Sequence, residues 1–392
     1  MDVDADSVLD ADGDAGPGRI RRAQRSRREA QDDAQRCRAA VATSNRAIAV
    51  LTGMGNDHSA QSAPTTGDAV PGGDSPIITV IVSGRTRKVP RTGNMREDGS
   101  RAPNRMPPSD ELIMPRLSRK QLDLYHENGY LLVKDALCDE DLAPVRAAMM
   151  DTVDGIARTL INDGLLSSDY REAPFETRLA KIFADAGVDQ APRFGRSWRE
   201  RKPAYFELLT HPKVLDIAES IVGPEVLIHP IYNTRPMIPD TPLVVVPWHQ
   251  DIQYLDADLV AGLQIPTLWI PLVDVTHEMG CLQVGAKTKA RGVAPWHRED
   301  RSGTGFIEID DEHMEGVEVV TCEMTRGSIL LVDQMTYHRS TANTTDRVRW
   351  SVDLRYQATG HPTGFRDQEG WLARSAARPG KVVIWEQFAA ET

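Results

Sequence analysis

Val246-Pro247-Trp248-His249-Gln250-Asp251 is the stretch on which the interpretation of this chain depends. It follows a β-rich run, and two of its side chains, His249 and Asp251, are separated by a single residue. Alternate residues of an extended strand point to the same face, so we expect the imidazole and the carboxylate to emerge side by side. The pair supplies half of a metal site, and a third ligand must come from elsewhere.

A candidate for the third ligand lies near the C-terminus. Residues 327–332 form an apolar run, residues 333–337 predict a turn, and His338 begins the next segment. The interval between Asp251 and His338 is long enough for several strands, so a folded sheet can return His338 to the first pair. Two histidines and one carboxylate on one face form the facial triad of non-haem Fe(II) oxygenases, which leaves positions open for co-substrate and oxygen.

A strand after His338 offers a site for a carboxylate. Alternation places Arg349 and Ser351 on one face, where a guanidinium and a hydroxyl could hold the far end of a dicarboxylate. Arg347, two residues earlier, is the competing candidate.

The second half of the chain predicts a β-sandwich or jelly roll. Short β-rich segments recur there, separated by Gly, Pro or polar turns. They are Val226–Tyr232, Leu243–Val246, Thr267–Val273, Cys281–Val284, Val317–Thr321, Ser328–Val332 and Arg349–Gln357. The segments before them predict helices that buttress the sheets.

Local signals mark the ends of these helices. Ser118 followed by Gln121 is a capping box, and that helix should end at Gly129. Asp139 is expected to cap the second helix, and His211-Pro212 to start a third.

Residues 1–112 differ in composition from residues 113–392, which we expect to form the folded domain. Six aspartates lie within residues 1–14, an Arg-rich run spans residues 19–38, and a Ser/Thr/Gly/Pro-rich stretch follows. Such a segment has too little apolar surface to offset the entropy of ordering, so a disordered extension is expected, with Ile77–Val82 as an isolated strand without an evident partner. Met95, Met106 and Met114 offer alternative translation starts.

Charge and composition indicate which kinds of molecule the protein can bind. The first 112 residues hold 16 acidic and 16 basic side chains, so the remainder carries the whole net charge of −11. An acidic body argues against nucleic acid, although an anionic small molecule can still bind in a basic pocket. Four scattered cysteines fit a reducing cytosol, and the lack of a long apolar run predicts that the chain does not span a membrane, so a cytoplasmic location is expected. The expected oligomeric state is a monomer or a homodimer.

Several of these segments together resemble the phytanoyl-CoA dioxygenase family over about residues 115–360. The resemblance rests on Trp248–Asp251, Trp269–Leu272, Gly280–Val284, Gly327–Leu331, His338–Ser340 and Arg349–Ser351. It implies a double-stranded β-helix (jelly roll, cupin-like) and a dioxygenase that uses Fe(II), 2-oxoglutarate and O2. By the same resemblance, His249, Asp251 and His338 match the iron ligands, and Arg349 matches the arginine that binds 2-oxoglutarate.

The resemblance also bears on the reaction. Halogenating relatives carry a small residue where this chain has Asp251, so hydroxylation of an unactivated C–H bond of a small molecule is the expected outcome, with release of succinate and CO2. One departure is Gly285–Lys289, which replaces the usual Pro-Gly-Ser-His-like turn and puts that local loop in doubt.

Further residues are weaker candidates for the site. Ser351, Tyr232 and Trp269 are expected to contact 2-oxoglutarate. Gln250, Tyr254, Arg235 and Arg366 are candidates for binding the substrate, the last from a C-terminal lid segment.

Two other function classes compete with the oxygenase. One is a jelly-roll binding protein that has lost catalysis. The other is a cupin-like metal isomerase or hydrolase, in which the metal acts as a Lewis acid. Only the oxygenase consumes 2-oxoglutarate and O2 together.

Overall fold

The computed structural model describes residues 79–81, 116–194, 197–299 and 304–390. The expectation of a disordered extension therefore falls, apart from one strand, outside the described residues. That strand is β1 (Thr79–Ile81), and it pairs in parallel with β2 (Tyr130–Lys134). The prediction of a strand here is confirmed, but the statement that it has no partner is wrong, because the partner lies about fifty residues further along the chain.

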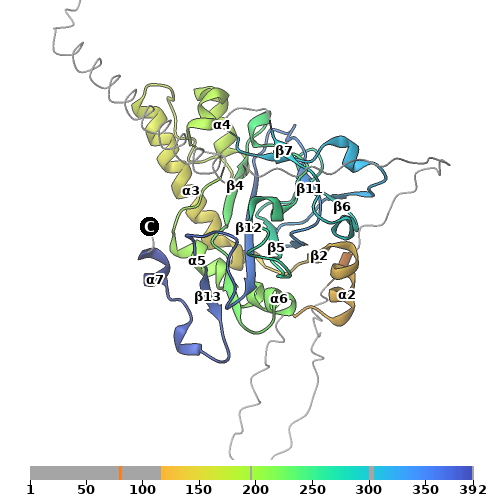
Figure 1. Ribbon diagram of the computed structural model, residues 1–392. Coiled ribbons are helices and arrows are strands. Elements are labelled where there is room, and N and C mark those ends of the chain that lie inside the picture. The colour runs from red at the N-terminus through yellow and green to blue at the C-terminus, as the bar shows by residue number, and fades with distance from the viewer. Residues whose placement is uncertain (1–78, 82–115, 195–196, 300–303, 391–392) are drawn as a thin grey trace, which may run out of the picture. The chain divides into compact units, whose positions relative to one another are not determined.

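Two sheets, antiparallel except for the β1–β2 pair, form the body of the molecule, as the jelly-roll prediction requires (Figure 1). The larger sheet has the order β1-β2-β10-β5-β12-β3-β13, with β4 also paired to β12, and the smaller has the order β11-β6-β9. The larger sheet adds β3 (Val226–Ile228), β4 (Asn233–Met237), β5 (Thr267–Pro271), β10 (Ile329–Val332), β12 (Arg349–Ala358) and β13 (Trp371–Arg374). The smaller contains β6 (Leu282–Gly285), β9 (Val319–Cys322) and β11 (His338–Ser340), while β7 (His297–Arg298) and β8 (Ile307–Glu308) form a separate pair.

Helices flank the larger sheet. They are α2 (Arg119–Asn128), α3 (Asp139–Asn162), α4 (Arg178–Ala186), α5 (Pro203–Leu209), α6 (Pro212–Val222) and α7 (Trp385–Ala390). The capping box of α2 is present, and Gly129 ends the helix in the left-handed conformation at φ 78°. The cap of α3 is Cys138 rather than Asp139, because Asp139 already has helical geometry and the Cys138 N–H bonds to the Asp141 carboxylate.

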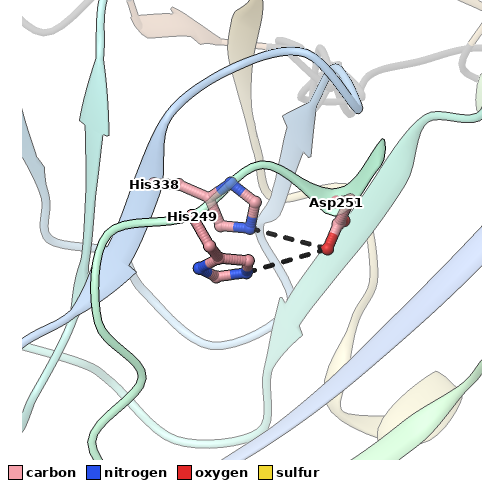
Figure 2. A group of neighbouring side chains, drawn as sticks. All are labelled: His249, Asp251 and His338. Atoms are coloured by element: carbon pink, nitrogen blue, oxygen red, sulfur yellow. Dashed lines mark ion pairs between the residues drawn. The ribbon is translucent and has the colours of Figure 1, made fainter. Parts of the chain in front are cut away.

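The stretch around the HxD pair is not a regular strand, and this corrects the sequence-based expectation. Residues 242–244 form a 3-10 turn, His249 makes only an isolated antiparallel bridge with His338, and Asp251 begins the 3-10 helix Asp251–Tyr254. Pro242 and Pro247 explain the difference, since proline has no N–H for a sheet ladder. The bridge nevertheless brings the first pair to His338, which lies at the start of β11 (Figure 2).

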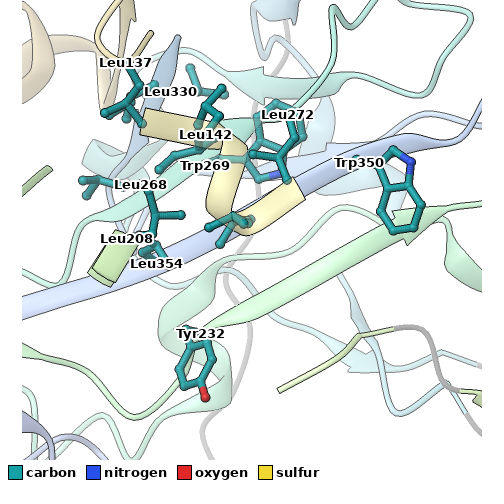
Figure 3. Packing of buried hydrophobic residues seen from close by; sticks show 14 of the residues in the cluster. Leu137, Leu142, Leu208, Tyr232, Leu268, Trp269, Leu272, Leu330, Trp350 and Leu354 are labelled. Carbon is teal, nitrogen blue, oxygen red and sulfur yellow. The ribbon is translucent and has the colours of Figure 1, made fainter. Parts of the chain in front are cut away.

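Strand β12 connects the core to the site because it is buried on both faces. Trp350, Val352, Leu354 and Tyr356 alternate on the face toward the helices, where the Tyr356 hydroxyl donates to the carbonyl of Leu209 in α5. Figure 3 shows Leu354 and Leu268 of the sheet near Leu208 of α5. The opposite face of β12 carries Arg349, Ser351, Asp353 and Arg355. Because these four polar side chains are buried, their hydrogen-bond partners must be found inside the fold.

Candidate metal centre

His249, Asp251 and His338 converge between the two sheets (Figure 2). The Nε2 atoms of His249 and His338 lie 3.8 and 3.9 Å from the same oxygen, Oδ1 of Asp251. All three side chains are buried. These separations are too long for hydrogen bonds, so the three ligand atoms face a common point without bonding to one another.

Backbone carbonyls fix the orientation of both imidazoles. Nδ1 of His249 lies 2.9 Å from the carbonyl oxygen of Pro247, and Nδ1 of His338 lies 2.9 Å from that of Thr336. A carbonyl oxygen only accepts, so each Nδ1 must carry a proton, and Nε2 is the ring nitrogen that each imidazole turns toward the centre. Burial, and next the neighbouring His338, lower the pKa of His249 to about 3, which keeps that ring neutral and able to bind a metal.

The side chains that hold Asp251 leave its Oδ1 open on the side of the two histidines. Its Oδ2 accepts from the Thr267 hydroxyl at 2.5 Å and from Nε of Arg355 at 3.2 Å, and Nη2 of Arg355 contacts both oxygens at 2.9 and 3.0 Å. Burial alone would raise the pKa of Asp251, but Arg355 and the two imidazoles lower it well below its usual range. The carboxylate is therefore ionised, with Oδ1 turned toward the histidines.

Replacing Thr267 with valine tests how much this support contributes. Valine keeps the size of the side chain and removes the hydrogen bond to Asp251. Loss of such an outer contact typically weakens metal binding by 10–100-fold, so we expect about a ten-fold lower Fe(II) affinity. Anaerobic competition with a chromogenic chelator measures it. Thr321→Val is the matched control, because the Thr321 hydroxyl contacts Gln283 on the smaller sheet instead, and equal Fe(II) affinity of the two variants would contradict the prediction.

Arg349 is a buried cation without a carboxylate partner among the described residues. Nη1 donates to Ser351 at 2.9 Å, Nη2 contacts the sulfur of Met237 at 3.2 Å, and Nε has no partner. The guanidinium lies 5.2 Å from the centre of the Trp269 ring. Burial, and next Arg235, lower the pKa of Arg349 to about 9. A thioether is a weak acceptor, so this environment fits a ligand that brings its own negative charge.

A cavity of about 850 Å³ opens beside His249 and Asp251. Its lining combines His249, Asp251 and three arginines with apolar side chains. The lining includes Ser197, Arg199, Asn233, Arg235, Leu243, Val246, Leu255, Phe306, Arg355 and Phe365.

The structure separates the weaker candidates. Arg235 and Tyr254 line the cavity, and the Tyr254 ring lies 5.8 Å from that of His249. Gln250 is buried and hydrogen-bonded to backbone at Gly292, Ala294 and Met335.

Other candidates lie away from the cavity. Arg366 is exposed and pairs with Asp256 at 3.4 Å, although the neighbouring Phe365 lines the cavity. Tyr232 lies in the core, where its hydroxyl donates to the carbonyl of Glu200. Arg347, the competitor of Arg349, is exposed.

Sequence reasoning missed Arg355 and Thr267, the two side chains that hold Asp251. A signal was present for the first. The alternation that joins Arg349 to Ser351 continues to Asp353 and Arg355 along the same strand. No local pattern distinguishes Thr267 from any other strand threonine.

Comparison with known proteins gives one family. A sequence profile described as phytanoyl-CoA dioxygenase (PhyH) matches residues 125–351. A probable phytanoyl-CoA dioxygenase of Caenorhabditis elegans is 24% identical over 262 residues, covering 61% of this chain and 75% of the relative. The peroxisomal phytanoyl-CoA dioxygenase of Homo sapiens is 23% identical over 254 residues, covering 61% and 68%. Among solved structures, EctD from S. alaskensis with bound Fe aligns with a TM-score of 0.44 at 18% identity, covering 69% of this chain and 86% of that one.

No helix among residues 116–194, 197–299 and 304–390 is long and apolar enough to cross a membrane.

Proposed function

The chain belongs to the phytanoyl-CoA dioxygenase family of non-haem Fe(II)- and 2-oxoglutarate-dependent oxygenases, and from that premise we propose that it hydroxylates an unactivated C–H bond of a small-molecule substrate. One observation carries the proposal. Two imidazole nitrogens and one carboxylate oxygen face a common point beside a cavity, and Arg349 on β12 is buried without a carboxylate partner among the described residues. The cavity gives a substrate carbon access to the ligand set.

The residues have separate roles in this proposal. His249, Asp251 and His338 would hold Fe(II), and Arg349, with Ser351 and the Trp269 ring beside it, would bind the distal carboxylate of 2-oxoglutarate. When bound, iron and 2-oxoglutarate supply the oxidising chemistry, in which O2 and 2-oxoglutarate yield succinate and CO2 while one oxygen atom enters the substrate. The carbonyls of Pro247 and Thr336 keep the two rings oriented, and Arg355 keeps Asp251 ionised.

The cavity wall positions the substrate and excludes water. Leu243, Val246, Leu255 and Phe365 offer an apolar surface near the ligands. Such a surface can hold a hydrocarbon portion of the substrate while solvent is displaced from the reacting carbon. This supports oxidation of a C–H bond that carries no activating group.

Anaerobic titration with Fe(II) and then 2-oxoglutarate tests the proposal. We expect a visible charge-transfer band when 2-oxoglutarate binds, which then justifies screening substrates by succinate release and by a product mass increased by one oxygen atom. Iron binding without a band would show that the site does not use 2-oxoglutarate as proposed. Substrate-dependent succinate release without oxygen in the product would contradict hydroxylation.

A further inference from the structure

A hydrogen-bonded row of polar side chains runs along the cavity from the metal centre. Arg355 contacts Asp251 at one end and donates to Asp353 at 2.7 Å. Asp353 also accepts from Nε of Arg235 and from the amide nitrogen of Asn233, both at 2.6 Å. The Asn233 amide oxygen in turn accepts from Nε of Arg199 at 2.9 Å. The row therefore places Arg199 and Arg235 on the cavity wall beyond the ligand set.

Two of these arginines use only one edge of the guanidinium. Arg199 and Arg235 each donate through Nε alone, and their Nη groups have no partner within the described part of the chain. Arg355, in contrast, uses Nε and both Nη groups on carboxylates. A guanidinium with a free Nη pair can bind a carboxylate or phosphate by two parallel hydrogen bonds.

The side chains that hold Arg199 and Arg235 are themselves fixed by hydrogen bonds and charge. The Asn233 oxygen accepts from both Arg199 and Ser197, and its nitrogen donates to Asp353, which determines the orientation of the amide. Asp353 is buried, and although burial raises the pKa of its carboxyl, Arg235 and Arg355 lower it to about 2. Partial burial, and next the positive charge of Arg235, lower the pKa of Arg199.

The charges along the row do not balance. Arg199, Arg235 and Arg355 contribute three positive charges, while Asp251 and Asp353 contribute two negative ones. If Asp251 binds Fe(II), its charge is directed to the metal and the positive excess grows. An excess of this kind inside a chain with a net charge of −11 favours a negatively charged ligand in the cavity.

We propose that Arg199 and Arg235 bind an anionic head group, a carboxylate or phosphate, of an amphiphilic substrate. Its apolar body lies against Leu243, Leu255 and Phe306 on the cavity wall. The head group sets the distance of each substrate carbon from the ligand set, so the pair determines which carbon is oxidised. This inference rests on the proposed function, because it concerns the substrate of that same centre.

Binding of matched probes tests the site. Octanoate, octyl phosphate and the neutral 1-octanol are titrated calorimetrically into anaerobic protein saturated with Fe(II) and 2-oxoglutarate, so that Arg349 is already occupied. We expect at least one of the two anions to bind at least ten-fold more tightly than the alcohol, and their ratio distinguishes carboxylate from phosphate. Arg199→Met and Arg235→Met should each remove at least ten-fold of that preference. Arg366→Met is the matched control, because Arg366 is exposed and pairs with Asp256.

The outcomes separate this inference from the function on which it rests. Equal affinity for the three probes, absence of anion binding, or an unchanged preference in Arg199→Met and Arg235→Met overturns the anion site. If the charge-transfer band is normal in that case, the proposed oxygenase function stands. Absence of the band in the wild-type protein overturns both. A melting temperature equal to wild type for Arg199→Met excludes misfolding as the cause of a lost preference.

Discussion

Replacing Asp251 with alanine is expected to lower Fe(II) affinity by at least about 100-fold and to abolish 2-oxoglutarate turnover. The change removes the only negatively charged member of the ligand set. Loss of an outer contact alone costs 10–100-fold in affinity, so loss of a ligand should cost more. Fe(II) affinity is measured by anaerobic chelator competition, and turnover by succinate release.

The same variant has a structural consequence that must be separated from metal loss. Arg355 loses its contacts to Asp251 but keeps Asp353, so its charge is not left alone. Removing one member of a buried ion pair costs about 3–5 kcal/mol when no partner remains, and a smaller loss is expected here. Asp251→Asn keeps the shape and should also lose iron. Asp256→Asn serves as the control, since the Asp256 carboxylate pairs with exposed Arg366. Retention of Fe(II) by Asp251→Ala would contradict the proposed ligand set.

The convergence of His249, Asp251 and His338 could be predicted from the sequence, because the fold keeps the first two side chains close together and returns the third to them. His249 and Asp251 are separated by one residue in the sequence. The strands after residue 327 bring His338 to the opposite side of the same site, where it forms a bridge with His249. The predicted reason was only partly correct. An extended strand was expected through the HxD pair, yet Pro242 and Pro247 reduce it to one bridge before a 3-10 helix. Both prolines are visible in the sequence, and they could have corrected the expectation of a regular strand.

The surroundings of the ligands were harder to predict because they depend on pairing between distant segments. Thr267 reaches Asp251 from β5, and Arg355 reaches it from β12, 104 residues away. Arg199 comes from a stretch that shows no regular pattern in the sequence, and it reaches β4 through the neighbouring Trp198–Thr234 bridge and its own hydrogen bond to the Asn233 amide. To predict which side chains hold a metal ligand or face a substrate, the register between the paired strands must be known. Sequence periodicity gives their face but not their neighbours.

Replacing Arg349 with methionine should separate co-substrate binding from stability. We expect 2-oxoglutarate affinity to fall by at least about 30-fold, since truncating one member of a buried charged pair costs about 2–5 kcal/mol. The free energy of unfolding without ligands should be unchanged or higher. Arg349 is a buried cation with an unpaired Nε and a sulfur contact, so an apolar side chain of similar length removes a desolvation cost. The charge-transfer titration and urea unfolding measure the two quantities.

A loss of 2-oxoglutarate affinity without a loss of stability distinguishes a binding arginine from a structural one. A structural Arg349 would lose stability and 2-oxoglutarate affinity together, because its replacement would disturb Ser351 and Trp269. A binding Arg349 loses affinity alone, since its counter-charge arrives only with the ligand. Arg347→Met, on the exposed residue two positions earlier, should change neither quantity. If Arg349→Met leaves the 2-oxoglutarate affinity unaltered, another cationic side chain must bind the co-substrate. Arg235 would be the first to test.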